Sequence, residues 1–301
     1  MSLVSDLRRQ GARSVLPARS RRADPLERSP LELLRSRRRD RVLMQVILVA
    51  LALWWLFPLY VAVRKSVEFG GFANYQLLFT QPISGIWLPR TFVNSAVIAA
   101  IHALVVVVCS ALAGFAFSRL TWRGRDLAYT GTLMFLAVPA TALLVPIYYI
   151  TGRLGMFDSY AAVAFPEATL TLPFGVLLIK NFSDGLPGSM FEAAVLDRAN
   201  AFQTFWHVFL PQIRTPLTNL AILSVMWSFQ DYLFPSLVLR SPEKVTSAQA
   251  VSLIQGAFGA TPQQQSQFFA ALVLLALPAV VLVTVGLRWI TKGVTAGATK
   301  G

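Results

Sequence analysis

The sequence predicts an all-α membrane protein with six transmembrane helices. Hydrophobic residues make up 55% of the 301 residues and charged residues only 14%, against about 25% charged in ordinary soluble domains. Apolar windows of about 20 residues with few charges, the length that crosses a bilayer, recur six times. Twelve of the 27 Lys and Arg residues precede the first window. The basic charge is therefore a tail and not a nucleic-acid-binding face.

Each predicted span is long enough to cross about 30 Å of hydrocarbon. The first is too long for the apolar core of a secretory signal peptide, and about forty mostly basic residues precede it, so we expect a retained helix. Pro173 interrupts the fourth span, and Asp231 and Pro235 interrupt the fifth. The spans cover residues 42–63, 92–117, 127–150, 161–179, 217–239 and 268–289.

The distribution of positive charge predicts the orientation. With a cytoplasmic N-terminus, 21 Lys and Arg lie inside and six outside, and without the tail the count is nine against six. We therefore expect both termini in the cytoplasm. We also expect residues 1–41 to form a basic, disordered tail that rests on anionic membrane lipid, residues 91–290 to form the main transmembrane domain, and residues 291–301 to form a cytoplasmic C-terminal tail.

The cytoplasmic loop 183–212 is predicted to be two short helices joined by a sharp turn. Ser189 and Glu192 have the spacing of a capping box, and Asn200 and Gln203 offer a second. The second helix carries an apolar stripe, which either packs on this chain's own helices and the lipid interface or contacts another protein. A DNA-binding unit is disfavoured because the loop carries little Lys or Arg. The stripe consists of Phe202, Phe205, Trp206 and Phe209.

A few polar residues lie within the spans. Asp231 is the most informative, because an ionisable group in a membrane span usually faces the bundle interior or water; its role is either solute contact or a structural bond between helices. Glu167 lies near the outer end of its span, where we expect its side chain to reach water. His102 is expected to hydrogen-bond a neighbouring helix, and Asn94 to be structural.

The sequence offers no pattern for a cofactor or a metal. It has a single cysteine, Cys109, and two histidines, which excludes an intrachain disulfide and a cysteine-based metal cage. No phosphate-binding glycine loop or metal-ligand spacing occurs. We therefore expect no metal and no cofactor.

Residues 192–211, EAAVLDRANAFQTFWHVFLP, resemble the EAA loop of ABC-importer permeases, whose usual form is EAA, three residues, Gly, about nine residues and Ile-x-Leu-Pro. Arg198 stands where the family has Gly. That Gly would adopt a left-handed conformation at the end of the first helix, so Arg there should cost about 1 kcal/mol. Segments such as FANYQLLF and the terminal GVTAGATKG resemble the carbohydrate-uptake subfamily, particularly its maltose/glycerol-phosphate type second permease.

The resemblance implies the type-1 ABC importer permease fold, with the helix-turn-helix as a cytoplasmic coupling loop. It implies a homologous second permease, cytoplasmic ATP-binding subunits, an extracytoplasmic solute-binding protein and a bacterial-type cytoplasmic membrane. Hydrolysis then belongs to a separate subunit, and this chain is not an enzyme. The solute would be a carbohydrate; glycerol phosphate, amino acids and polyamines are alternatives, and a secondary transporter or a non-transporting scaffold is less favoured.

The resemblance also assigns two sets of site residues. The path set matches the family's Trp-Asn-Asp/Glu-Phe segment, with Phe229 in the Trp position. The predicted solute path is Phe229, Gln230, Asp231 and Tyr232. The predicted ATPase-coupling residues are Glu192, Ala193, Ala194, Asp197, Arg198, Ala199, Phe202, Phe205, Leu210 and Pro211.

Overall fold

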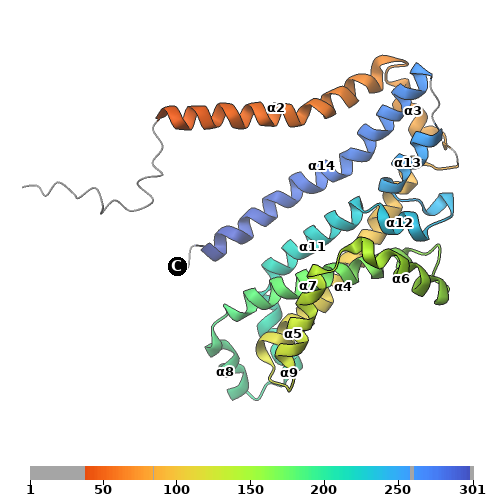
Figure 1. The fold of residues 1–301 in the computed structure, drawn as a ribbon. Helices are drawn as coiled ribbons and strands as arrows, with labels where there is room; N and C mark the ends of the chain where they lie inside the picture. Colours follow the sequence, from red (N-terminus) through yellow and green to blue (C-terminus); the bar gives the residue numbers. More distant parts are fainter. Residues whose placement is uncertain (1–37, 84, 258–260, 299–301) are drawn as a thin grey trace, which may run out of the picture. The chain divides into compact units, whose positions relative to one another are not determined.

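The structure, a computed structural model, describes residues 38–83, 85–257 and 261–298 (Figure 1). Within these ranges the regular secondary structure is helical apart from one isolated bridge between Ile83 and Ile86, and short turns and loops join the helices. The chain divides into two units, up to residue 57 and from residue 58 onward. The first contains most of α2 (Arg38–Glu68), whose apolar side chains are exposed. Such a surface suits lipid or another apolar partner.

The second unit holds all the remaining described helices. The core of this unit is α4 packed along α7 and α11, with α14 along α11. In chain order they are α3 (Ala73–Thr80), α4 (Leu88–Arg119), α5 (Arg125–Met134), η2 (Phe135–Ala137), α6 (Ala140–Arg153), α7 (Tyr160–Asp184), α8 (Gly188–Leu196), α9 (Ala201–Gln203), η3 (Thr204–Phe209), α10 (Leu210–Gln212), α11 (Arg214–Gln230), α12 (Leu233–Val238), η4 (Pro242–Lys244), α13 (Ser247–Ala257) and α14 (Pro262–Ala298).

Small residues let α4 and α7 approach closely. A Cβ added to Gly114 of α4 would lie 2.5 Å from the Ile179 Cγ2 of α7, and one on Gly175 would lie 2.2 Å from the Ser110 Oγ. Contacts this short would force the two helices apart. Glycine at both positions therefore holds α7 against α4, as small residues do in membrane helix pairs.

Four described helices are long and apolar enough to cross a membrane, and a bent pair would make a fifth. The four are α2, α4, α7 and α14, which coincide with the first, second, fourth and sixth predicted spans. The helix α14 continues to Ala298, into the predicted C-terminal tail, whereas most of the predicted N-terminal tail lies outside the described residues.

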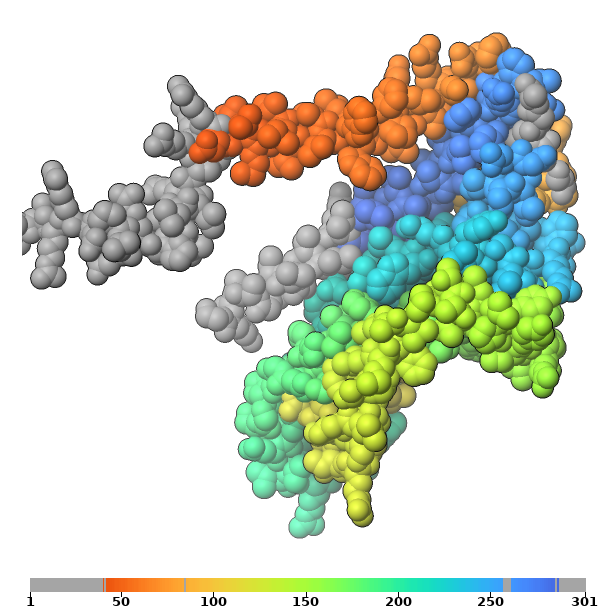
Figure 2. Space-filling model, viewed as in Figure 1, coloured from red at the N-terminus to blue at the C-terminus, as the bar shows by residue number. Residues whose placement is uncertain are grey.

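The third predicted span is broken, which corrects the expectation of one helix over residues 127–150. The helices α5 with η2 and α6 meet at an angle of 104°. Val138 and Pro139 at the break are extended, with ψ of 119° and 132°. A proline disfavours the helical conformation in the residue before it, so the Val138-Pro139 pair ends the helix. Figure 2 shows α5 and α6, in yellow-green, on the visible face of the second unit.

The interruptions predicted in the fourth and fifth spans have different outcomes. The helix α7 runs unbroken through Pro166 and Pro173. By contrast, α11 ends at Gln230 and Asp231 is extended, so the predicted break there is confirmed. With 17 residues, α11 alone is shorter than the roughly 20 residues that cross a bilayer.

Candidate functional site: the helical loop and the pocket at the α11 break

The helical loop α8 to α10 begins differently from the prediction. The N-cap of α8 is Pro187, which makes no side-chain cap bond, so the capping box predicted for Ser189 and Glu192 is wrong. Ser189 already lies inside the first turn, where its hydroxyl cannot act as N-cap. The second capping box is confirmed: the Gln203 N–H donates to Asn200 Oδ1 and the Asn200 N–H to Gln203 Oε1, both at 2.9 Å.

The turn between α8 and α9 places Arg198 in a conformation that favours glycine. Its φ is 58°. The Ala199 N–H donates to the Ala194 carbonyl at 2.9 Å and the Arg198 N–H to the Val195 carbonyl at 3.0 Å. This pair of bonds is a Schellman motif, in which residue 198 occupies the left-handed position. The predicted left-handed geometry at Arg198 is therefore confirmed.

The predicted apolar stripe is divided between two faces. Phe205 and Phe209 are buried and pack on Phe115 of α4, with ring centroids 5.5 and 5.0 Å away. Phe202 and Trp206 are exposed and stack on each other at 6.2 Å. Residues 204–209 form a π-helix, which holds more residues per turn than an α-helix, so the four positions do not share one face. Packing on this chain's own helices is therefore confirmed for Phe205 and Phe209, whereas a contact with another protein stays a prediction for the exposed Phe202 and Trp206.

Four of the ten predicted coupling residues line a shallow groove between α8 and η3. The groove has a volume of about 420 Å³ and is lined in part by Ala193, Ala194, Asp197 and Ala199. Ala194, like Phe205, is buried by its own helices, while Ala199, Leu210 and Pro211 are half-buried. The freely exposed members are Glu192, Ala193, Asp197, Arg198 and Phe202.

Arg119, a residue that the sequence did not single out, joins this loop to α4. Its Nη2 donates to the carbonyl of Ser183 and, at 3.1 Å, to that of Leu186. Its guanidinium lies 4.1 Å from the ring centroid of Phe191 on α8. The last turn of α4 thus holds both the end of α7 and the start of α8. The sequence signal that could have identified Arg119 is its position as a single Arg at the end of an apolar span.

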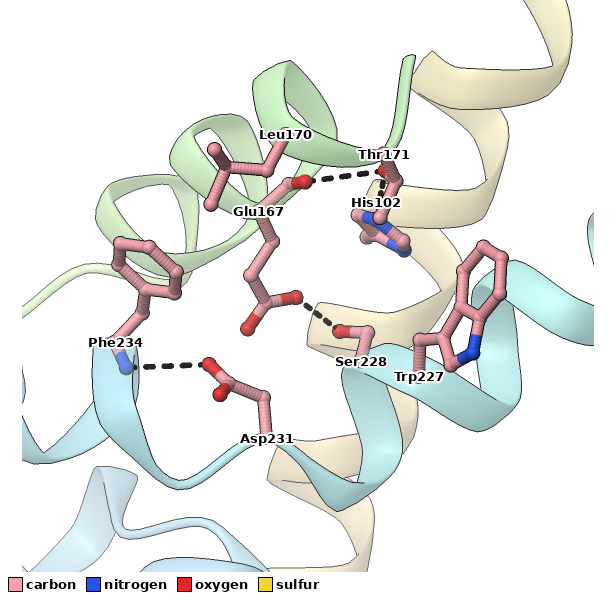
Figure 3. Close-up of a pocket in the computed structure, with 8 residues that line it drawn as sticks. All are labelled: His102, Glu167, Leu170, Thr171, Trp227, Ser228, Asp231 and Phe234. Carbon is pink, nitrogen blue, oxygen red and sulfur yellow. Dashed lines mark hydrogen bonds between the residues drawn. The ribbon is translucent and has the colours of Figure 1, made fainter. Parts of the chain in front are cut away.

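The second candidate region is a pocket at the end of α11 (Figure 3). It has a volume of about 150 Å³ and receives residues from α4, α7, α11 and α12. Among the described residues no group of His, Cys, Asp and Glu is placed to hold a metal ion. The lining residues are His102, Glu167, Leu170, Thr171, Trp227, Ser228, Asp231 and Phe234.

Glu167 is buried, so the expectation that it reaches water is wrong. Its side chain points from α7 towards α11 (Figure 3), and the residue is only 5% exposed. The Ser228 hydroxyl donates to Oε2 at 2.5 Å, while Oε1 is buried without a hydrogen-bond partner among the described residues. Nothing in the sequence indicated that Ser228 lies opposite Glu167, because the two residues are 61 positions apart.

His102 behaves as predicted and connects three helices. Its Nδ1 donates to the Ser224 carbonyl of α11 at 3.1 Å, and its Nε2 lies 2.8 Å from the Thr171 hydroxyl of α7. The Thr171 hydroxyl also lies 3.1 Å from the Glu167 carbonyl. The ring is fully buried. His102 therefore fixes the wall of the pocket beside Glu167.

Asp231 is the only one of the four predicted path residues that lines this pocket. Its Oδ1 accepts from the Leu233 N–H and its Oδ2 from the Phe234 N–H, both at 3.1 Å. These bonds satisfy N–H groups at the start of α12, which would otherwise lack partners. Phe229 is buried, whereas Gln230 and Tyr232 are exposed.

Asn94 is structural, as predicted. Its Nδ2 donates to the carbonyls of Glu243 and Val245 at 2.9 and 2.8 Å, and the Tyr160 hydroxyl donates to its Oδ1 at 2.7 Å. Asn94 thereby joins α4 to α7, to η4 and to the residue that follows η4.

Asp158 holds a neighbouring loop junction. Burial acts to raise the pKa of its carboxyl, but bonds from the Ser241 hydroxyl and N–H, the Arg240 N–H and Lys244 outweigh burial and hold the pKa well below its ordinary value. The loop before α7 is therefore fastened to the segment after α12.

The profile of a family described as "Binding-protein-dependent transport system inner membrane component" matches residues 106–296. The inner membrane ABC transporter permease protein YcjP of Escherichia coli is 30% identical over 70% of this chain and 74% of its own length. A maltodextrin transport system permease protein of Bacillus subtilis is 29% identical over 87% and 97%. A trehalose transport system permease protein of Mycobacterium tuberculosis is 26% identical over 82% and 91%.

A solved structure has the same fold. A chain of a bacterial ABC transporter involved in the import of the acidic polysaccharide alginate superposes with a TM-score of 0.70 at 18% sequence identity. The match covers 84% of this chain and 98% of that one.

Proposed function

This chain belongs to the family of binding-protein-dependent transport system inner membrane components, and we propose that it is the permease subunit through which an ATP-driven importer moves a carbohydrate. The observation that carries the carbohydrate assignment is the similarity along most of the chain to permease proteins for maltodextrin and trehalose. Members of this family are permeases, and this chain is not an enzyme.

The proposed assembly contains a homologous second permease, cytoplasmic ATP-binding subunits and an extracytoplasmic solute-binding protein. The exposed apolar side chains of α2 and of one side of α4, among them Leu104 and Leu112, are suited to lipid or to a second membrane subunit. We place the helical loop and both termini in the cytoplasm, in line with the excess of Lys and Arg on that side. In this arrangement α11 with α12, and the bent pair, complete a six-span subunit.

The groove between α8 and η3 is the proposed contact with the ATP-binding subunit. Small side chains at Ala193 and Ala199 allow a partner to approach the backbone, while Glu192 and Asp197 offer exposed negative charge beside it. The exposed pair of Phe202 and Trp206 extends this surface with apolar area. Aromatic residues in such positions commonly dominate binding energies.

Motion of this loop would reach the spans through two connections. Phe205 and Phe209 pack into the same core cluster as Phe115 and Val106 of α4. Arg119 adds the polar connection from α4 to α7 and α8. A short unit anchored at several points moves as a rigid body, which suits the transmission of ATPase closure.

The pocket at the α11 break is the proposed part of the solute path. It combines carboxyl and hydroxyl oxygens with the ring of Trp227. The hydroxyl groups of a sugar can hydrogen-bond to these oxygens, and the apolar face of a sugar ring can pack on the Trp227 ring.

Solute uptake by the complete reconstituted transporter tests this function. Vesicles containing the two permeases and the ATP-binding subunits are supplied with binding protein and labelled solute, with ATP or a non-hydrolysable analogue on the cytoplasmic side. We expect ATP-dependent uptake of a neutral saccharide such as maltose, maltotriose or trehalose. Uptake of only glycerol phosphate, an amino acid or a polyamine would contradict the carbohydrate assignment, and uptake without ATP would contradict the importer class.

A further inference from the structure

We infer that Glu167 and Asp231 together recognise one hydroxyl group of the solute: the Glu167 carboxyl donates a hydrogen bond to it, and the Asp231 carboxyl accepts one from it. The inference rests on the proposed function and specifies its substrate class, a solute with a free hydroxyl at the recognised position. Two observations carry it, the surroundings of the Glu167 carboxyl and the hydrogen bonding of its two oxygens.

The surroundings of Glu167 keep its carboxyl uncharged. The residue is only 5% exposed, and among the described residues that line the pocket none is Lys or Arg. Both ring nitrogens of His102 are engaged elsewhere, with the Ser224 carbonyl and the Thr171 hydroxyl. A second carboxyl, that of Asp231, lines the same small pocket. A buried carboxyl beside another carboxyl, with no cation to pair with, retains its proton.

The contact with Ser228 indicates which oxygen of Glu167 carries that proton. An uncharged carboxyl has one O–H to donate. The Ser228 hydroxyl lies 2.5 Å from Oε2 and makes no other hydrogen bond among the described residues, so its own proton goes to Oε2. The carboxyl proton is then on Oε1, which is buried and has no partner within the described part of the chain. A buried donor in this state is costly until an acceptor satisfies it.

Asp231 supplies the acceptor on the other side of the pocket. Its carboxyl and that of Glu167 point towards one another (Figure 3), and both line the volume of about 150 Å³. Oδ1 and Oδ2 of Asp231 each accept one backbone N–H, from Leu233 and Phe234. Each of these oxygens retains a further lone pair for a hydrogen bond from the pocket. The pocket thus has a donor on α7 and an acceptor at the start of α12.

A hydroxyl group is the part of a solute that fits between a donor and an acceptor. It accepts from Glu167 Oε1 and donates to Asp231, whereas an ether or carbonyl oxygen only accepts and an ammonium group only donates. The apolar face of a sugar ring can pack on Trp227, which also lines the pocket. The volume is smaller than the roughly 300 Å³ at which ordinary ligand pockets begin, so the pocket receives one part of a solute.

Infrared spectroscopy of the purified complete transporter tests the state of Glu167. A protonated carboxylic acid has a C=O stretching band that a carboxylate lacks. We expect this band in wild type at neutral pH and its loss in Glu167→Gln. Glu243→Gln is the matched control and should keep the band, because that side chain is 73% exposed and lies outside the pocket. A band that is absent from wild type, or unchanged in Glu167→Gln, would overturn the inference.

Equilibrium dialysis of the same transporter, without binding protein, tests the contact with the solute. The probes are the saccharide taken up in the uptake measurement, whether maltose, maltotriose or trehalose, and the set of its analogues that each lack one hydroxyl. Glu167→Gln keeps an uncharged N–H donor, whereas Glu167→Leu has a similar size and no donor. The infrared measurement does not depend on the Glu167→Leu variant.

We expect one of the analogues to bind wild type about ten-fold more weakly than the parent saccharide. Glu167→Gln should retain at least about half of that preference, and Glu167→Leu should reduce it to about two-fold, because the donor that contacts the hydroxyl is gone. The same preference in wild type and Glu167→Leu would overturn the inference alone. Absence of ATP-dependent uptake of any saccharide by wild type would overturn the proposed function, and this inference with it.

Discussion

Replacing Arg198 by glycine should stabilise the turn between α8 and α9. A non-glycine residue in the left-handed region costs about 1–2 kcal/mol, and Arg198 has a φ of 58°. Glycine loses about 0.5–1 kcal/mol more chain entropy on folding. The difference is a net gain of about 0.5–1 kcal/mol for Arg198→Gly. The Arg198 side chain is exposed, and no side-chain bond of Arg198 is present among the described residues, so little is lost with it.

Hydrogen exchange of the loop measures this gain. A peptide covering residues 193–204 reports local opening, and 0.5–1 kcal/mol corresponds to exchange about two to five times slower in Arg198→Gly. Arg198→Ala is the matched control, because alanine removes the same side chain and keeps the Cβ that causes the strain. Equal exchange rates in the glycine and alanine variants would refute the reasoning. Transport lost equally in both would instead assign the Arg198 side chain to a partner contact.

Three further perturbations follow from the contacts described above. Arg119→Gln should lower uptake per ATP hydrolysed several-fold, because two carbonyls and Phe191 lose their partner; uptake equal to wild type would rule out Arg119 as a link between α4 and α8. The ordinary pKa of an Asp carboxyl, 3.8, applies to Asp158 in the unfolded chain, and the pKa is lower in the folded chain. Below about pH 4 the carboxyl is therefore ionised only in the folded chain, so its stabilising effect is complete above about pH 4 and is lost as the pH falls further. Asp158→Asn should therefore flatten the acid side of a thermal unfolding profile, and an unchanged profile would contradict this role. Gly114→Ala should lower the unfolding temperature of the purified protein, since its Cβ would meet Ile179 at 2.5 Å, whereas an equal or higher temperature would show that α4 and α7 repack without cost.

Local sequence signals predicted those features that depend on neighbouring residues. The α4, α7 and α14 spans follow from composition, and the capping box at Asn200 follows from spacing. The left-handed turn at Arg198 followed from the family resemblance rather than from propensity. In each case the responsible contacts lie within a few residues along the chain.

Features that depend on packing were beyond the same signals. Helical spacing could not separate Phe202 from Phe205, because the π-helix of η3 changes the repeat. The depth of Glu167 is set by Ser228, 61 residues away in the sequence. The break at Val138-Pro139 did have a local sequence signal, because proline restricts the conformation of the residue before it. The prediction missed this signal because residues 127–150 are predominantly apolar and carry no charge, which favours one uninterrupted span.

The measurement that tests the central claim most directly is ATP hydrolysis and saccharide uptake recorded in the same vesicles, for wild type and Glu192→Lys. Glu192 is exposed on α8, at the edge of the proposed contact with the ATP-binding subunit. We predict that wild type couples binding-protein-stimulated hydrolysis to uptake, and that Glu192→Lys loses uptake while remaining in the membrane at normal amounts. Undiminished uptake by Glu192→Lys, or wild-type uptake that continues without ATP, would contradict the account.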